Sequence, residues 1–362
     1  MCGRVASDAF AVVLTAGPDV DIEAILRAAL QSIGRPHWVD NVVRVSAHAG
    51  FAQAPHHATT RGELTRRANR ALRAAAKKSP GSIVIFDLSI DTTSNDQKFI
   101  HRELPRAISA NELEVHYQPI VSSQGGRMVG VEALLRWTHA TRGAIQPTTF
   151  IPVAEQMGLM DTIGAFVLRR TLQDARRWPD DLYVAVNLSP LQVRDRTIVD
   201  MVRSALADSA VAPSRLVLEI TEGVLIDDRD EMVKRINDLH ELGVRVALDD
   251  FGSGYYNLGY LQRFPLDKLK IDRSFVAALG RSSNGGVIIQ AIVAFGRALG
   301  LSVLVEGVET EHQRVLLRLA GCDEMQGFLF AKPAPAKAID KLLAQAKQGG
   351  KPLSAADEAL TA

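Results

Sequence analysis

The chain has 362 residues, of which 47% are apolar and 23% charged, and these values exclude a fibrous or largely disordered protein. Its 42 basic and 41 acidic residues give a net charge of +1, which does not favour binding to nucleic acid or to a membrane surface. Two cysteines make no disulfide framework, and no apolar run is long enough to span a bilayer. The sequence therefore predicts a soluble, cytoplasmic protein of about two domains.

The first ninety residues predict a short α/β segment. Its strands are expected at 10–14, 42–47 and 82–87, and its helices at 21–33 and 62–78. Residues 91–101 are mostly polar and predict a linker or the start of a linking helix. At the other end of the chain, 346–362 is rich in glycine and small residues and predicts a flexible tail.

Residues 102–345 repeat one pattern, in which a short β-branched run ends in a polar residue and an amphipathic helix usually follows. The eight expected strands are 113–121, 128–134, 182–188, 215–221, 244–249, 268–271, 301–305 and 324–330. The main expected helices are 149–177, 193–207, 228–242, 285–299 and 311–320. This alternation predicts an α/β protein with a (β/α)8 barrel. A doubly wound open sheet has the same periodicity and stays as the alternative.

Polar side chains end seven successive strands of this pattern. They are Glu132, Asn187, Glu219, the pair Asp249 and Asp250, Lys270, Glu306 and Gln326. Each alone is as consistent with a solvated loop or a helix cap. Because the C-terminal ends of barrel strands form one active face, the whole set predicts a site.

The carboxylates of this set predict metal binding. Converging carboxylates repel one another unless cations lie among them. Oxygen ligands without histidine or thiolate favour Mg2+ or Mn2+. At least five carboxylates are too many for one octahedral ion, so we expect two ions, the arrangement used in phosphoryl chemistry.

Seven motifs in chain order carry a family resemblance. They lie at 132–137 (EALLRW), 187–189, 219–222, 249–254, 269–272, 306–309 and 326–328. Together they resemble the EAL domain, a family of bacterial phosphodiesterases that hydrolyse the second messenger cyclic di-GMP to linear pGpG. The resemblance covers roughly residues 102–340. It implies an EAL-type barrel that binds cyclic di-GMP and hydrolyses it with metal ions.

The resemblance also implies a role for each motif residue. The first metal would be bound by Glu132, Asn187, Glu219 and Asp249, and the second by Asp249, Asp250 and Glu306. Lys270 matches the lysine that contacts the attacking water, as general base or as orienting group, and both roles stay open. Gln326 matches a glutamine of the water network. Glu222 matches the anchor of the loop after the fifth strand, and Glu309 an acidic residue beside the site.

Substrate contacts are implied at four further positions. Arg136 matches an arginine that meets the dinucleotide phosphate, which suits its bidentate donor group. Gln118 and Leu135 match residues that line a nucleotide pocket, and Glu155 matches a glutamate that approaches a guanine. In the loop, Ser253 stands where the family more often has threonine, and Tyr256–Asn257 replaces two small residues.

Residues 1–90 resemble the second half of a GGDEF domain, the diguanylate cyclase fold, through the stretches 4–14, 46–52 and 63–72. The signature at 6–10 reads Ala-Ser-Asp-Ala-Phe, so both signature glycines are missing and Ala9 replaces a metal-binding acid. We therefore expect a partial, degenerate domain without cyclase activity. A truncated sequence and a surviving remnant both explain it, and a match that begins inside the fold favours truncation.

Two other functions compete with hydrolysis. A receptor of this family would bind cyclic di-GMP without cutting it, and typically lacks metal ligands or the loop glutamate, which are present here. An interaction scaffold would tolerate Glu132→Ala. The resemblance also implies a homodimer formed through the barrel.

Overall fold

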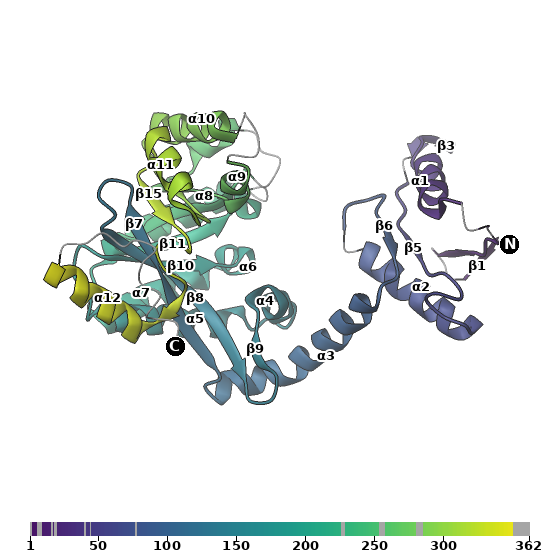
Figure 1. Ribbon diagram of the computed structural model, residues 1–362, viewed down its shortest axis with the longest axis horizontal. Helices are drawn as coiled ribbons and strands as arrows, with labels where there is room; N and C mark the ends of the chain where they lie inside the picture. Colours follow the sequence, from purple (N-terminus) through teal and green to yellow (C-terminus); the bar gives the residue numbers. More distant parts are fainter. Residues whose placement is uncertain are drawn as a thin grey trace. The chain divides into compact units, whose positions relative to one another are not determined.

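The computed structural model describes residues 2–5, 9–15, 17, 20–39, 41–43, 45–76, 78–225, 229–252, 258–279 and 285–349. The chain divides into two compact units, and the boundary lies between Phe99 and Ile100 (Figure 1). This boundary lies inside helix α3 (Leu88–Ser109), so residues 91–101 are helical rather than irregular. None of the described helices is long and apolar enough to cross a membrane.

The first unit is built from short elements. They are β1 (Cys2–Arg4), β2 (Phe10–Val12), α1 (Ile22–Ile33), β3 (His37–Val39), β4 (Asn41–Val43), β5 (Ala49–Phe51), α2 (Arg61–Ala75) and β6 (Ile83–Ile85). Strands β1 and β2 pair antiparallel, as do β3 and β4, whereas β5 and β6 pair parallel. Helix α1 has no buried residue, while α2 buries Ala71 and Ala75. The result is a small core with apolar side chains such as Phe10 and Val13 exposed.

The second unit is a closed barrel of eight strands. They are β7 (Leu113–Ser122), β8 (Met128–His139), β10 (Tyr183–Leu188), β11 (Leu216–Thr221), β12 (Arg245–Phe251), β13 (Lys268–Ile271), β14 (Ser302–Val305) and β15 (Glu324–Gln326). The ring closes because β7 pairs with both β8 and β15. Closure confirms the predicted barrel and excludes the doubly wound open sheet. Two short strands, β9 (Gly143–Ile145) and β16 (Ala334–Pro335), pair antiparallel with β8 and β7, respectively.

Strand β7 departs from the repeating pattern that the sequence predicts. It runs antiparallel to β8 and to β15, whereas the other neighbouring strands of the ring are parallel. A tight turn with Gly125 and Gly126 at positive φ joins β7 to β8, so no helix separates them. The barrel therefore begins with a hairpin rather than with a β/α unit.

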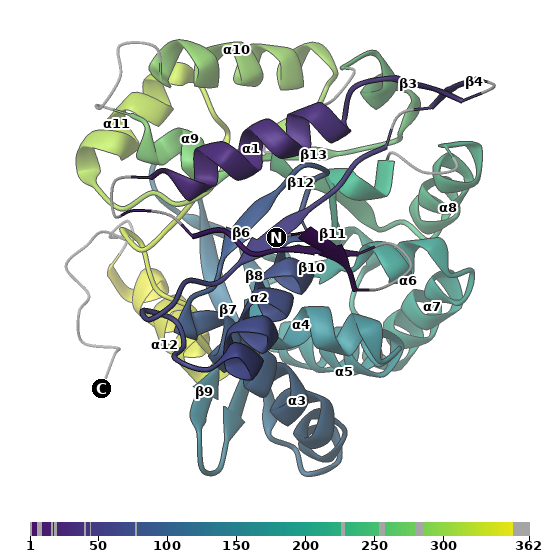
Figure 2. The ribbon, with the colours of Figure 1, turned by 90° about the vertical axis from the view of Figure 1, so that its right-hand side faces the viewer.

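Helices lie outside the strands (Figure 2). They are α4 (Pro147–Gln156), α5 (Met160–Ala175), α6 (Pro190–Arg194), α7 (Thr197–Ser209), α8 (Arg229–Glu241), α9 (Arg273–Ala277), α10 (Gly285–Ala298), α11 (Glu311–Ala320) and α12 (Ala336–Gly349). The helix expected at 149–177 is two helices, which separate near Gly158 at φ +67°. The strand expected at 324–330 ends at Gln326. Of the predicted tail, 346–349 belongs to α12 and 350–362 lies outside the described residues.

The barrel interior is layered along the strands. Alternate residues of each strand face inward. Small and aliphatic residues fill the middle layer, namely Ile120, Ala185, Val217, Ala247 and Leu304, with the ring of Tyr183 against them. This apolar layer separates polar residues at the C-terminal ends of the parallel strands from a second polar group near their N-terminal ends.

Candidate active site

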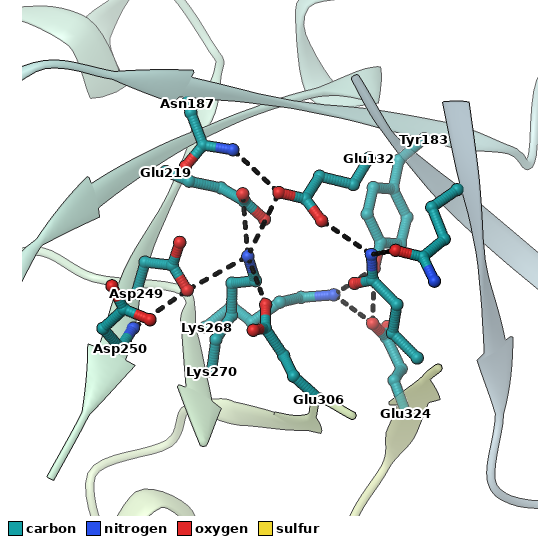
Figure 3. Close-up of polar contacts among 12 residues, drawn as sticks. Glu132, Tyr183, Asn187, Glu219, Asp249, Asp250, Lys268, Lys270, Glu306 and Glu324 are labelled. Atoms are coloured by element: carbon teal, nitrogen blue, oxygen red, sulfur yellow. Dashed lines mark hydrogen bonds and ion pairs between the residues drawn. The ribbon is translucent and has the colours of Figure 1, made fainter. Parts of the chain in front are cut away.

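The predicted polar residues at the strand ends do converge (Figure 3). Strand register explains why, because Asn187 lies beside Glu219 across β10 and β11, and Gln118 lies beside Glu132 across β7 and β8. Asp249 lies near the end of the next strand, β12, with Lys270 on β13 beyond it. Neighbouring strands thus bring their last inward-facing side chains to one end of the barrel.

Lys270 occupies the centre of this cluster and is fully buried. Its Nζ lies 2.7 Å from Glu306 Oε1, 2.8 Å from Glu219 Oε2 and 3.1 Å from Asp249 Oδ1. Glu132 Oε1 lies further away, at 3.8 Å. One ammonium therefore lies within ion-pair distance of four carboxylates.

This arrangement fixes the protonation of Lys270. Burial by itself disfavours the ammonium, but Asp249, Glu132, Glu219 and Glu306 outweigh that effect and hold the pKa of Lys270 well above its ordinary value. The side chain is thus a cation and a hydrogen-bond donor.

Glu132 is held by hydrogen bonds from side chains of two other strands. Asn187 donates from Nδ2 to Glu132 Oε1 at 2.7 Å, and Gln326 donates from Nε2 to Glu132 Oε2 at 2.6 Å. Gln326 Nε2 also lies 3.1 Å from Gln118 Oε1. Although burial alone would raise the pKa of Glu132, Lys270 and these hydrogen bonds keep it below its usual value. Glu132 is therefore an ionised, oriented carboxylate.

Two consecutive aspartates face the same side of the barrel mouth. In a regular strand, neighbouring side chains point to opposite faces. Here a register shift between Leu248 and Phe251, with Asp250 at φ +56°, breaks the alternation. Carboxylate oxygens of Asp249, Asp250 and Glu306 consequently lie within 4.8 Å of one another, a spacing that suits a shared cation.

The cluster holds more negative than positive charge. Five carboxylates gather around one ammonium, and burial followed by repulsion between carboxylates raises the pKa of Asp250. Burial likewise raises the pKa of Glu219 well above its ordinary value, and that of Glu306 to about 7, despite the opposing effect of Lys270. Divalent cations would relieve this excess, and carboxylate and amide oxygens are the ligands that Mg2+ and Mn2+ prefer. The residues present therefore fit a metal site.

Glu222 anchors the beginning of the loop that follows β12. It lies in a short 3-10 helix, η2 (Glu222–Leu225), and is only 4% exposed. Its Oε1 accepts a hydrogen bond of 2.9 Å from the backbone N–H of Gly252, which has φ +95°. Ser253 and Tyr256–Asn257, where departures from the family pattern were expected, lie outside the described residues.

The residues expected to contact substrate are more dispersed. Gln118 belongs to the cluster, and Arg136 is close enough to Glu132 for that carboxylate to oppose the lowering of the Arg136 pKa by burial. Arg136 Nη1 donates to its neighbour Leu135. Glu155 lies on α4, half-buried. Glu309 is exposed, and its backbone N–H donates to Gln313 Oε1.

Three polar residues inside the barrel were not expected from the sequence. Tyr183, Lys268 and Glu324 contact one another near the N-terminal ends of the strands (Figure 3). The available signal was spacing, because Lys268 and Glu324 each stand two positions before a site residue and therefore face the same side of their strand.

Fold and site together define a class of protein, an α/β barrel with a carboxylate-rich cation site at the C-terminal ends of its strands. A family model described as the EAL domain matches residues 101–333, so the chain belongs to the EAL domain family. The match begins at residue 101, and the GGDEF-like character of the first ninety residues stays a prediction.

Similar proteins extend the comparison. The bifunctional diguanylate cyclase/cyclic di-GMP phosphodiesterase MucR of Pseudomonas aeruginosa is 38% identical over 341 residues, covering 93% of this chain and 50% of MucR. Cyclic di-GMP phosphodiesterase NbdA of the same organism is 35% identical over 345 residues, covering 94% of this chain and 44% of NbdA. The solved structure of the PaMucR phosphodiesterase in a c-di-GMP complex has a TM-score of 0.64 and 43% identity, covering 66% of this chain and 99% of that one. The chain thus spans half or less of these curated relatives.

Proposed function

We propose that this protein hydrolyses cyclic di-GMP to linear pGpG with two bound Mg2+ or Mn2+ ions. The observation that carries the proposal is the complete set of acidic side chains around the buried ammonium of Lys270. MucR and NbdA are both named as cyclic di-GMP phosphodiesterases, which supports the same substrate here. A cytoplasmic location and a homodimer formed through the barrel are further parts of the proposal.

The side chains of the cluster divide the work of hydrolysis. Bound ions would neutralise the carboxylates and polarise the phosphodiester. A water oxygen attacks phosphorus, the bond to the 3′ oxygen breaks, and that oxygen gains a proton. Without ions the carboxylates raise the pKa of Lys270, and the resulting ammonium can orient water as a donor. Cations bound to the same carboxylates would oppose that raise, so the orienting and the base role both stay open. Arg136 would bind a phosphate oxygen of the dinucleotide.

Product analysis tests the proposed reaction. The full chain is incubated with cyclic di-GMP and Mn2+ or Mg2+, and nucleotides are separated by ion-exchange chromatography. We expect pGpG from the wild type. The rate of Glu132→Ala should be at least about a hundredfold lower, because that change removes a carboxylate held by hydrogen bonds from two other strands. Glu114→Ala on β7, whose side chain is 62% exposed, is the matched control and should keep wild-type activity.

The same assay separates the two competing functions. Binding of cyclic di-GMP without product, measured by calorimetry, would establish a receptor and overturn the proposed hydrolysis. If the protein neither binds cyclic di-GMP nor forms product, the barrel would instead be a scaffold for protein partners.

Loss of the Glu222 anchor should weaken metal binding and turnover together. Glu222→Ala removes the acceptor for Gly252 N–H and frees the backbone just after Asp250. We expect Mn2+ affinity and kcat each to fall by about tenfold to a hundredfold, the usual effect of removing a group that orients a ligand. Glu222→Gln keeps an amide oxygen as acceptor and should lose less. Equal losses in both variants would show that the negative charge matters rather than the hydrogen bond.

A further inference from the structure

A second polar group is buried in the same barrel, below the apolar layer. Tyr183, Lys268 and Glu324, here called the lumen triad, come from three different strands. Lys268 donates from Nζ to the Tyr183 hydroxyl at 2.6 Å, and both groups contact Glu324 Oε2 (Figure 3). Lys268 is 3% exposed and Tyr183 5%. All three polar groups are therefore satisfied by one another inside the barrel.

Each strand of the lumen triad also carries a residue of the catalytic cluster. Lys268 precedes Lys270 by two positions on β13, and Glu324 precedes Gln326 by two on β15. Tyr183 precedes Asn187 by four positions on β10. Residues two or four apart on a strand point to the same face. Fixing the position of a triad residue along the barrel axis therefore fixes the position of the cluster residue on the same strand.

Two more strands are held by the ring of Tyr183. A Cβ atom placed on Gly130 would lie 2.5 Å from this ring, so the ring packs directly on the β8 backbone, two residues before Glu132. From β12, two strands away in the ring, the guanidinium of Arg245 lies 5.0 Å from the ring centroid, on the strand that carries Asp249. Contacts of the lumen triad thus reach five of the strands that supply the cluster.

The apolar layer is less able to fix the positions of the strands along the barrel axis. Three of its residues are the small side chains Ala185, Val217 and Ala247, and apolar contacts are not directional. Strand β15 has only three residues, Glu324–Gln326, so its own ladder is short. Hydrogen bonds and ion pairs have a preferred length and angle, and a shift along the strand breaks them.

We propose that the lumen triad is a positioning device that sets the register of β10, β13 and β15 and thereby the placement of Asn187, Lys270 and Gln326 in the catalytic cluster. The inference rests on the proposed hydrolysis for its kinetic readout, but metal affinity provides an independent one. Tyr183, Lys268 and Glu324 are positioning residues and touch no substrate.

A variant in which all three triad residues are apolar distinguishes a positioning role from a role in stabilising the fold. The triple variant Tyr183→Phe/Lys268→Met/Glu324→Met leaves no buried charge unpaired, and such replacements are often neutral or stabilising. We expect a melting temperature at or above that of the wild type. We also expect kcat about tenfold to a hundredfold lower with KM little changed, because small displacements of catalytic groups cost rate. Mn2+ affinity should fall about tenfold.

Single tyrosine variants provide the matched comparison. Tyr183→Phe removes a hydroxyl inside the barrel, whereas Tyr117→Phe removes a buried hydroxyl that donates to Asp174 Oδ2 at 2.8 Å outside it. We expect only Tyr183→Phe to lower kcat and Mn2+ affinity, even if both lower the melting temperature.

The possible outcomes are distinct. A triple variant that is as stable and as active as the wild type, with unchanged Mn2+ affinity, overturns the proposal. Equal losses in Tyr183→Phe and Tyr117→Phe also overturn it. If the wild type hydrolyses nothing, the proposed function fails, and unequal Mn2+ affinities of the two tyrosine variants still support the positioning role.

Discussion

Lys270→Met should destabilise the metal-free protein strongly. The substitution leaves four carboxylates, all within 3.8 Å of the former ammonium, buried without their cation. Removing one partner of a buried pair costs about 3–5 kcal/mol. For a domain of this size, that corresponds to a fall in melting temperature of about 10 °C in EDTA, measured by scanning calorimetry.

Mn2+ should restore most of that stability but not the activity of the variant. Cations compensate the carboxylates, whereas the donor that orients water is lost. Lys270→Arg, which keeps the charge, is the control and should be less destabilised in EDTA. An unchanged melting temperature for Lys270→Met in EDTA would contradict the central role assigned to this ammonium.

Stability of the metal-free protein should fall as pH rises. The pKa of Glu306 is raised from 4.5 to about 7 by burial and by its carboxylate neighbours, and that of Glu219 is raised as well. A group with a raised folded-state pKa stabilises the fold below its unfolded pKa and loses that contribution as pH passes the folded value. Glu306 alone accounts for a loss on the order of 3 kcal/mol between about pH 4.5 and pH 7.

Urea unfolding in EDTA across this range measures the effect. Glu306→Gln removes one titrating carboxyl, and its pH dependence should be weaker than that of the wild type. Saturating Mg2+ should reverse the slope, because the ions bind the deprotonated ligands. A free energy of unfolding that rises with pH in EDTA would show that the carboxylates are stabilised as anions without metal.

The sequence predicts the barrel well because apolar periodicity marks each strand. Residues 113–121 and 268–271, for example, become β7 and β13 almost unchanged. Periodicity carries no information on strand direction, however, so the antiparallel β7 was not predicted. The break between α4 and α5 depends on one glycine turn, which is a weak signal within a long helical pattern.

The catalytic cluster was predicted at the level of residues but not of geometry. Strand ends identify Glu132 and Lys270, yet nothing in a linear sequence shows that the ammonium lies at the centre of the carboxylates. The approach of Asp249 and Asp250 to the same point depends on a bulge, and a bulge depends on pairing with β13. The lumen triad was missed because its members are 56 to 141 positions apart.

Strand β7 joins the two ends of the barrel, and this sets the order in which the barrel folds. Its hairpin with β8 is a local contact, whereas its pairing with β15 brings together Gln118 and Gln326, which are 208 positions apart. Loop closure delays distant contacts relative to local ones. The hydrogen bond from Gln326 to Glu132 is consequently among the last to form, and a chain still emerging from the ribosome has no complete site until β15 follows.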